Sequence, residues 1–115
     1  MIFVTGPMFS GKEKCICDML GITHEEFLKR GVRDVETMVF DHDIDVLAEN
    51  LCQKDIVIAS EIGAGVIPMD ADQTRQREQA GRLAQILAER ADVVVRVVCG
   101  IPQVLKDKDS SLRSE

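Results

Sequence analysis

Short apolar runs alternate with amphipathic stretches along most of the chain. Four runs are dominated by apolar and β-branched side chains, at residues 2–5, 37–40, 56–59 and 93–98. We expect each of them to form a strand. The last run is nearly continuous, with Arg96 as its exception, which is typical of a strand covered on both faces in a parallel sheet.

Between these runs, apolar positions recur every three or four residues, as in helices that pack one face against a sheet. A first helix is expected from Gly11 to Gly21. The Thr and Glu spacing in residues 23–26 predicts a capped second helix that ends at Gly31, and Asp43 is a candidate cap for a third. The third helix should bury Val46, Leu47 and Leu51. The longest helix has its apolar positions at Ala80, Leu83, Ala84, Leu87 and Ala91.

The connection between the first strand and the first helix has the pattern of a phosphate-binding loop. Its glycines and lysine are spaced so that backbone N–H groups, the helix N-terminus and the lysine can converge on phosphate oxygens. The candidate phosphate-binding residues are Gly6, Pro7, Met8, Phe9, Ser10, Gly11, Lys12 and Glu13.

Several residues of this loop depart from the usual pattern. Pro7 has no N–H to donate, and Met8 and Phe9 are bulky for a loop that wraps a ligand. Glu13 stands where a Ser or Thr hydroxyl usually contacts Mg²⁺, and its charge could repel a phosphate about as strongly as Lys12 attracts one. A loop that binds a nucleotide and an empty loop, in which Glu13 only caps the helix, therefore both stay open.

The order of strands and helices predicts an α/β fold, namely a P-loop NTPase-like parallel sheet of about four strands flanked by helices. We expect a single domain over residues 1–106. Residues 107–115 are polar and without periodicity, so we expect a flexible tail, with fraying from about residue 106.

Acidic residues follow two of the predicted strands. Asp41 comes after 37–40 and Glu61 after 56–59, which places both at the carboxyl edge of the sheet, where they could hold Mg²⁺. Glu61 is also a candidate catalytic residue with Lys12. Gly63 and Gly65 follow it and would let a ligand approach closely. A turn or N-cap role is the alternative for Asp41, and a position outside any site is the alternative for Glu61.

Other polar residues are weaker candidates. His24 and His42 could be general bases or nucleotidyl acceptors, but both lie in polar helix-start segments, where a solvated or capping His is more common. Arg77 and Arg82 could reach an anionic ligand or a neighbouring subunit, or could belong to a solvated helix face. The four cysteines lack a paired metal-binding spacing, and we expect buried, reduced thiols.

The composition limits the classes of partner. A net charge of −6 argues against an extended nucleic-acid surface, and the chain has no Trp or Tyr for stacking bases. No apolar stretch approaches the roughly 20 residues that span a bilayer. We therefore expect no membrane segment and a cytoplasmic location.

Several motifs follow one another in the C-terminal half, at residues 60–68, 77–85 and 97–100, and residues 4–6 and 10–12 form the glycine and lysine part of the loop. In order and spacing, these motifs resemble those of the adenosylcobinamide kinase / adenosylcobinamide-phosphate guanylyltransferase family of cobalamin biosynthesis. The similarity covers residues 1–20 and 55–106.

The resemblance implies a nucleotide-dependent kinase or nucleotidyltransferase that uses GTP or ATP with Mg²⁺, acts on adenosylcobinamide, and forms a homo-oligomer with sites between subunits. It also implies that the loop and Lys12 hold phosphates, that Glu61 places the metal or the acceptor hydroxyl, and that Arg77 or Arg82 contacts ligand or neighbour.

The chain departs from the family pattern at Glu13, Phe9 and Ala84, where the family has a hydroxyl residue, an arginine and an asparagine. It is also shorter before the glycine-rich motif, in the stretch that carries the family's guanylyl-accepting histidine. The alternative function is therefore that of a catalytically degraded homologue that binds, regulates or forms oligomers.

Overall fold

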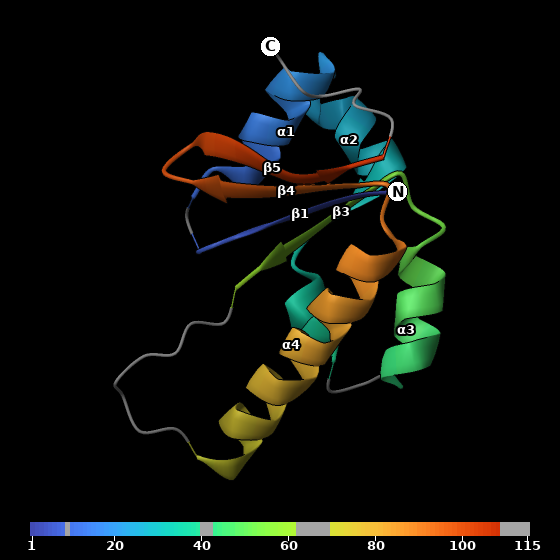
Figure 1. Ribbon diagram of the computed structural model, residues 1–115, viewed down its shortest axis with the longest axis vertical. Coiled ribbons are helices and arrows are strands. Elements are labelled where there is room, and N and C mark those ends of the chain that lie inside the picture. Colours follow the sequence, from blue (N-terminus) through green and yellow to red (C-terminus); the bar gives the residue numbers. More distant parts are fainter. Residues whose placement is uncertain (9, 40–42, 62–69, 109–115) are drawn as a thin grey trace.

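The computed structural model describes residues 1–8, 10–39, 43–61 and 70–108 (Figure 1). Its centre is a five-stranded sheet in the order β2-β3-β1-β4-β5, in which β5 alone is antiparallel to its neighbour. The strands are β1 (Ile2–Gly6), β2 (Gly31–Val32), β3 (Ile56–Ser60), β4 (Val93–Val98) and β5 (Ile101–Asp107). The mixed α/β class and the mainly parallel sheet confirm the fold prediction, with one more strand than expected.

Helices cover both faces of the sheet. In Figure 1, α1 and α2 lie on one side of the strands, and α3 and α4 lie on the other. A short 3-10 helix, η1, lies beside the end of β3 and contacts α4. The helices are α1 (Lys12–Leu20), α2 (His24–Arg30), η1 (Val35–Met38), α3 (Ile44–Leu51) and α4 (Ala71–Arg90). Among the described residues, no helix has both the length and the apolar character that crossing a membrane requires.

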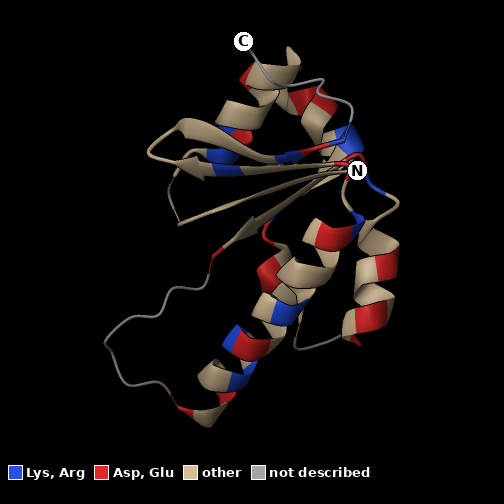
Figure 2. Ribbon diagram, viewed as in Figure 1, with Lys and Arg blue, Asp and Glu red and all other residues tan. Residues whose placement is uncertain are grey.

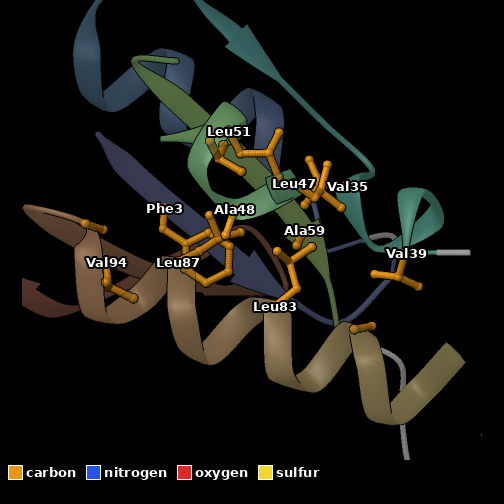
Figure 3. Close-up of a cluster of buried hydrophobic side chains, with 13 residues drawn as sticks. Phe3, Val35, Val39, Leu47, Ala48, Leu51, Ala59, Leu83, Leu87 and Val94 are labelled. Carbon is orange, nitrogen blue, oxygen red and sulfur yellow. The ribbon is translucent and has the colours of Figure 1, made fainter. Parts of the chain in front are cut away.

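The two helical layers bury two separate hydrophobic clusters against the sheet. Successive residues of a strand point to opposite faces, so Phe3 joins the cluster under α3 and α4, whereas Val4 joins the cluster under α1 and α2. Figure 3 shows the first cluster, in which Leu87 of α4 lies beside Phe3 and Leu83 lies beside Ala59. Because the central strands are buried on both faces, their sequences lack a polar alternate position, as expected for parallel strands.

The long helix α4 is fixed at both ends. Asp70 and Gln73 form a capping box at its N-terminus, in which each side chain accepts the other residue's backbone N–H. At its C-terminus, Lys106 Nζ donates to the carbonyl oxygens of Ala88 and Glu89, at 3.1 and 2.8 Å. A side chain of β5 thus satisfies carbonyl groups that the helix itself leaves unpaired.

The prediction of a strand at residues 37–40 is wrong for residues 37–39, which the structure describes. Val35 to Met38 form η1, and β2 at Gly31–Val32 pairs with β3 instead. Asp34 has a left-handed conformation, with φ 57°, that turns the chain out of the sheet. Gly31 suits the tight place beside β3, because a Cβ there would lie 2.7 Å from a ring carbon of Phe27.

The end of the sheet also differs from the prediction. Instead of fraying from about residue 106, the chain forms β5 through Asp107, which is buried, and Lys108 N donates to Asp92 O at 3.0 Å. A two-residue turn, Cys99 and Gly100, connects β4 to β5. The single-domain boundary itself stays a prediction, and residues 109–115 lie outside the described residues.

Two side-chain expectations need correction. In α3, Leu47 and Leu51 are buried as predicted, but Val46 is 53% exposed. The predicted buried thiols are confirmed for Cys15 and Cys17, and burial raises the pKa of both. Cys99, by contrast, is exposed at the β4–β5 turn.

Candidate functional site

The loop between β1 and α1 is shaped by glycines that no other residue could replace without strain. Gly6 has a φ of 150°, and a Cβ there would lie 2.2 Å from the Val97 carbonyl oxygen, which is an overlap with backbone. Gly11 has a left-handed φ of 79° directly before α1. The Gly6 carbonyl oxygen accepts the Glu61 N–H at 2.8 Å, so the start of the loop is joined to the end of β3.

Lys12 is the first residue of α1, and its side chain turns back into this loop. It is buried, and its Nζ donates to the Pro7 carbonyl oxygen at 2.7 Å. Burial lowers the pKa of Lys12, while the negative charges of Glu36, Asp34 and Glu61 oppose that shift. The Lys12 side chain thus reaches back into the loop, and its role in holding phosphates stays a prediction.

An open depression of about 450 Å³ lies over the loop and the start of α1. Cys15 N makes the first backbone bond back along the helix, to Gly11 O at 2.9 Å, so helix geometry leaves the N–H groups of residues 12–14 without intrahelical acceptors. Donors of this kind attract anions. The depression is lined by Met8, Ser10, Gly11, Lys12, Glu13, Lys14, Arg33, Asp34, Ile58 and Ser60.

Ser10 is a buried polar residue of the loop. Its Oγ is buried and has no hydrogen-bond partner in the described part of the chain. Its carbonyl oxygen accepts the Gly100 N–H at 2.7 Å. The loop thus holds a hydroxyl group that could donate to a ligand, on a backbone segment tied to the β4–β5 turn. Phe9, the preceding candidate, lies outside the described residues.

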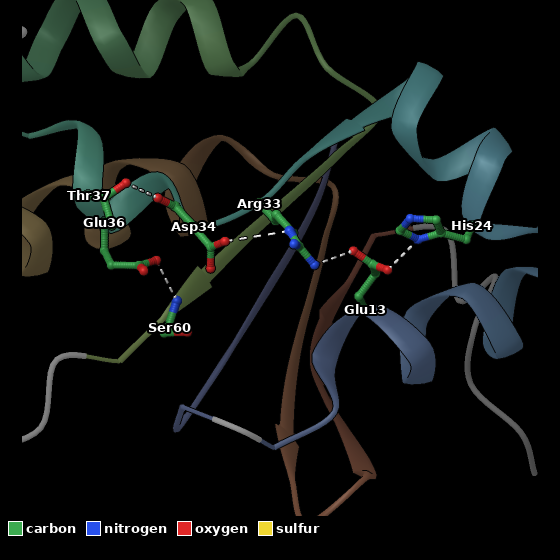
Figure 4. Close-up of polar contacts among 7 residues, drawn as sticks. All are labelled: Glu13, His24, Arg33, Asp34, Glu36, Thr37 and Ser60. Carbon is green, nitrogen blue, oxygen red and sulfur yellow. Dashed lines mark hydrogen bonds and ion pairs between the residues drawn. The ribbon is translucent and has the colours of Figure 1, made fainter.

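Glu13 interacts with side chains outside the loop (Figure 4). Its Oε1 accepts from Arg33 Nη1 at 3.1 Å, and its Oε2 lies 2.6 Å from His24 Nδ1. These contacts tie α1 to α2 and to the segment after β2. They also explain His24, which is a partner of Glu13 rather than a group in the loop. His42 lies outside the described residues.

Glu61 is held by an arginine. Its two carboxylate oxygens accept from Arg96 Nε at 2.7 Å and Arg96 Nη2 at 3.0 Å, and this bidentate hydrogen bonding lowers the pKa of Glu61. Arg96, the polar residue within the apolar run of β4, is therefore explained by its partner Glu61, which follows the last residue of β3. Because Arg96 occupies both oxygens, Glu61 is less available as a metal ligand than the sequence indicated.

Other predicted residues of this edge cannot be placed. Asp41, Gly63 and Gly65 lie outside the described residues. Within the described ranges, no three His, Cys, Asp or Glu side chains gather as a metal-ligand group. The predicted Mg²⁺ ligands therefore stay a prediction.

The sequence analysis missed Glu36. This side chain of η1 is 7% exposed, and its Oε1 accepts the Ser60 N–H at 2.8 Å, at the end of β3 (Figure 4). In the sequence, Glu36 is marked only as a charged residue next to an apolar one, Val35, which is a weak indication of a functional position. A strand assignment to the following residues hid it, because the position of Glu36 depends on the turn at Asp34.

A cavity of about 180 Å³ lies between the end of the sheet, η1 and α4. Its polar groups are Thr5, Glu36, Ser60, Glu61 and Arg77, and α4 supplies much of its apolar wall. The structure thus brings Arg77 to the same cavity as Glu61. Figure 2 shows that basic and acidic residues alternate along α4, and Arg82 lines a separate, open groove on that helix.

The sequence of this chain is similar to that of known proteins. The chain matches the family model for cobinamide kinase / cobinamide phosphate guanyltransferase over residues 8–105. It is also similar to the bifunctional adenosylcobalamin biosynthesis protein CobP of Pseudomonas aeruginosa, with 39% identity over 51 residues. That alignment covers 44% of this chain and 30% of the relative, so the match spans less than a third of the relative's length.

Proposed function

Because the chain belongs to the cobinamide kinase / cobinamide phosphate guanyltransferase family, we propose that its β1–α1 loop binds the phosphates of GTP or ATP for transfer of a phosphoryl or nucleotidyl group to cobinamide. The proposal includes adenosylcobinamide as acceptor, a homo-oligomer and a cytoplasmic location. Since the aligned relative is much longer than the matched segment, its activity is carried over only as part of this proposal.

The observation that carries the proposal is the placement of the two charges at the start of α1. Lys12 Nζ lies within the loop, at 2.7 Å from Pro7 O, whereas the Glu13 carboxylate is turned to Arg33 and His24. A unit charge about 4 Å away is worth roughly 4 kcal/mol at an effective dielectric near 20. The positive charge of Arg33 beside Glu13 opposes the repulsion that Glu13 would exert on a phosphate.

The cavity beside the loop supports a place for the acceptor. Gly6 O accepts Glu61 N, so the loop and this cavity share a backbone contact. An acceptor hydroxyl in this cavity would lie near Glu36 and Glu61, whose negative charges also act on Lys12. Arg77 would add a positive charge at the same cavity.

Mg²⁺ is compatible with this proposal. Mg²⁺ in nucleotide sites usually keeps several waters and is held by one or two carboxylates together with substrate phosphates. Glu36 could hold it in this way. Glu61 and Asp41 are further candidates, although Glu61 would first have to release a bond to Arg96. When bound, the metal would neutralise charge on the phosphates. Lys12 would hold the phosphates, and the buried walls of the cavity would exclude water from the acceptor.

A second candidate function is nucleotide binding without turnover. Glu13 stands where a hydroxyl would contact Mg²⁺, and it is committed to Arg33 and His24. A homologue with this substitution could keep the loop for binding, regulation or oligomer formation while having lost the transfer reaction.

Isothermal titration calorimetry with GTP and ATP, with and without Mg²⁺, tests the proposal. We expect Lys12→Met to weaken binding by about tenfold or more, since a charge-assisted hydrogen bond is lost. Lys29→Met, an equal change in charge on the exposed surface of α2, should bind as the parent does. Absence of binding by the parent, or equal binding by Lys12→Met, would refute the proposal.

Transfer from radiolabelled GTP to adenosylcobinamide separates the two candidate functions. Turnover by the parent supports the transferase. Binding without turnover, combined with turnover by Glu13→Ser, supports a degraded homologue.

A further inference from the structure

The turn between β4 and β5, formed by Cys99 and Gly100, lies against the phosphate loop. Gly100 N donates to Ser10 O at 2.7 Å, and a Cβ on Gly11 would lie 3.8 Å from Gly100 Cα. At the other end of the loop, Gly6 lies so close to Val97 O that no Cβ fits between them. The same hairpin therefore contacts both ends of the loop.

The turn has a demanding backbone conformation. Cys99 and Gly100 both have positive φ values, of 53° and 74°. Two consecutive left-handed residues are the conformation of the tight hairpin turn that follows the twist of the strands. Gly100 adopts this conformation freely, whereas Cys99 adopts it at some cost. The direction of the Gly100 N–H depends on this geometry.

The hydrogen bond to Ser10 O fixes more than the carbonyl group. The peptide unit between Ser10 and Gly11 is planar and trans, so its N–H points opposite to its C=O. With Ser10 O directed at Gly100, the Gly11 N–H points away from the hairpin. The Ser10 hydroxyl does not help to hold this peptide, because its Oγ is buried and has no hydrogen-bond partner in the described part of the chain.

We propose that the Cys99–Gly100 turn is a positioning element of the phosphate site, which holds the Ser10–Gly11 peptide so that the Gly11 N–H faces a bound phosphate. This inference rests on the proposed function, because it takes the loop to be an anion site. Gly100 and Cys99 act through the loop and do not touch the ligand. They are thus positioning residues, contributed from almost the opposite end of the chain.

A set of glycine variants tests this role, with inorganic tripolyphosphate as the probe because it reports on the loop without a base or sugar. A Cβ on Gly100 meets nothing within 4 Å, so Gly100→Ala acts only through the disfavoured left-handed conformation. We expect it to weaken tripolyphosphate binding by about tenfold, comparable to the loss of one hydrogen bond to an anion. Gly100→Asn should restore most of the affinity, since Asn tolerates this conformation.

Gly21→Ala is the matched control. Gly21 also has a left-handed φ, of 67°, and open space around its Cβ, but it ends α1 away from the loop. It should lower stability as Gly100→Ala does and leave the affinity unchanged. Cys99→Gly keeps the turn and relieves strain, so it should bind at least as well as the parent. It remains usable if Gly100→Ala does not fold.

The outcomes separate this inference from the proposed function. If the parent binds tripolyphosphate and Gly100→Ala binds equally well, the positioning role is wrong and the phosphate site stands. If the parent does not bind, the phosphate site and the inference fail together. The Gly11 amide resonance in NMR gives a readout without ligand. It should shift in Gly100→Ala and stay in place in Gly21→Ala, and an unmoved resonance in Gly100→Ala would overturn the inference.

Discussion

The β1–α1 loop and the acidic side of the neighbouring cavity, formed by Glu36 and Glu61, lie next to each other, yet they are held in different ways. The loop is fixed by backbone, through the conformations of Gly6 and Gly11 and the bond from Gly100 N to Ser10 O. The acidic side is fixed by side chains, through Glu36 on Ser60 N and Glu61 on Arg96.

The difference shows what each side can tolerate. A site held by backbone contacts does not depend on titrating groups. It cannot accept an added Cβ, however, where two backbone segments lie in contact, as Gly6 and Val97 do. A side-chain arrangement admits changes of shape but depends on charge and therefore on pH. Substitutions on the loop should consequently cost more than substitutions on the acidic side, and only the acidic side should respond to acid.

The largest effect is expected for Gly6→Ala. The new methyl group would overlap the Val97 carbonyl oxygen, so β1 and β4 would have to separate, and we expect a loss of about 3 kcal/mol or more in the free energy of unfolding. Urea denaturation measures it. Gly81→Ala, in α4 with open space around the Cβ, should instead stabilise the protein by about 0.5–1 kcal/mol. Equal stabilities of the two variants would contradict the backbone account of the loop.

An intermediate effect is expected for Glu36→Ala. Ser60 N would lose its acceptor in a buried place, which costs about 1–3 kcal/mol. Glu36→Gln retains an oxygen that can accept this hydrogen bond, so its cost in urea denaturation should be smaller. If Glu36→Gln is as destabilising as Glu36→Ala, then charge rather than the hydrogen bond to Ser60 holds η1 in place.

The smallest effect is expected at the partly exposed Glu61–Arg96 pair. Because the pKa of Glu61 is lowered in the folded protein, its stabilising contribution is present above the ordinary carboxyl pKa of about 4.3 and is lost as the pH falls through the lowered value. Arg96→Gln should lower the Tm by about 2 °C at pH 7 and by less near pH 3. Arg82, which forms no ion pair in the described part of the chain, gives the control Arg82→Gln. A difference that is constant with pH would rule out the ion pair as its cause.

The same division explains what the sequence could predict. The loop from Gly6 to Lys12 is a local pattern, since a strand, two spaced glycines and a lysine followed by a helix are contiguous. The continuous apolar runs likewise identified β1, β3 and β4, because strands covered on both faces need no alternation. The position of Glu61 at the carboxyl edge of the sheet could also be predicted, because it comes directly after the apolar run of β3.

The remaining features depend on contacts between distant residues. Arg96 is explained by its hydrogen bonds to Glu61, which follows β3, a strand that does not neighbour β4. Glu36 lies beside Ser60 because Asp34 turns the chain. β5 has exposed residues such as Ile101 and Leu105, and it exists because it pairs with β4. The sequence of residues 101–107 has no periodicity that would predict the pairing of β5 with β4.

The contact between Ser10 and Gly100 also concerns the order of events in folding. Nearly the whole chain lies between these residues, so closing this contact alone would cost loop entropy, and we expect it to form after the pairing of β1 with β4 has brought the two segments together. β5 has to be synthesised and paired before the turn exists. A chain synthesised only as far as Val98 therefore lacks the contact that, in our proposal, directs the Gly11 N–H towards an anion, because the Cys99–Gly100 turn and β5 come after it.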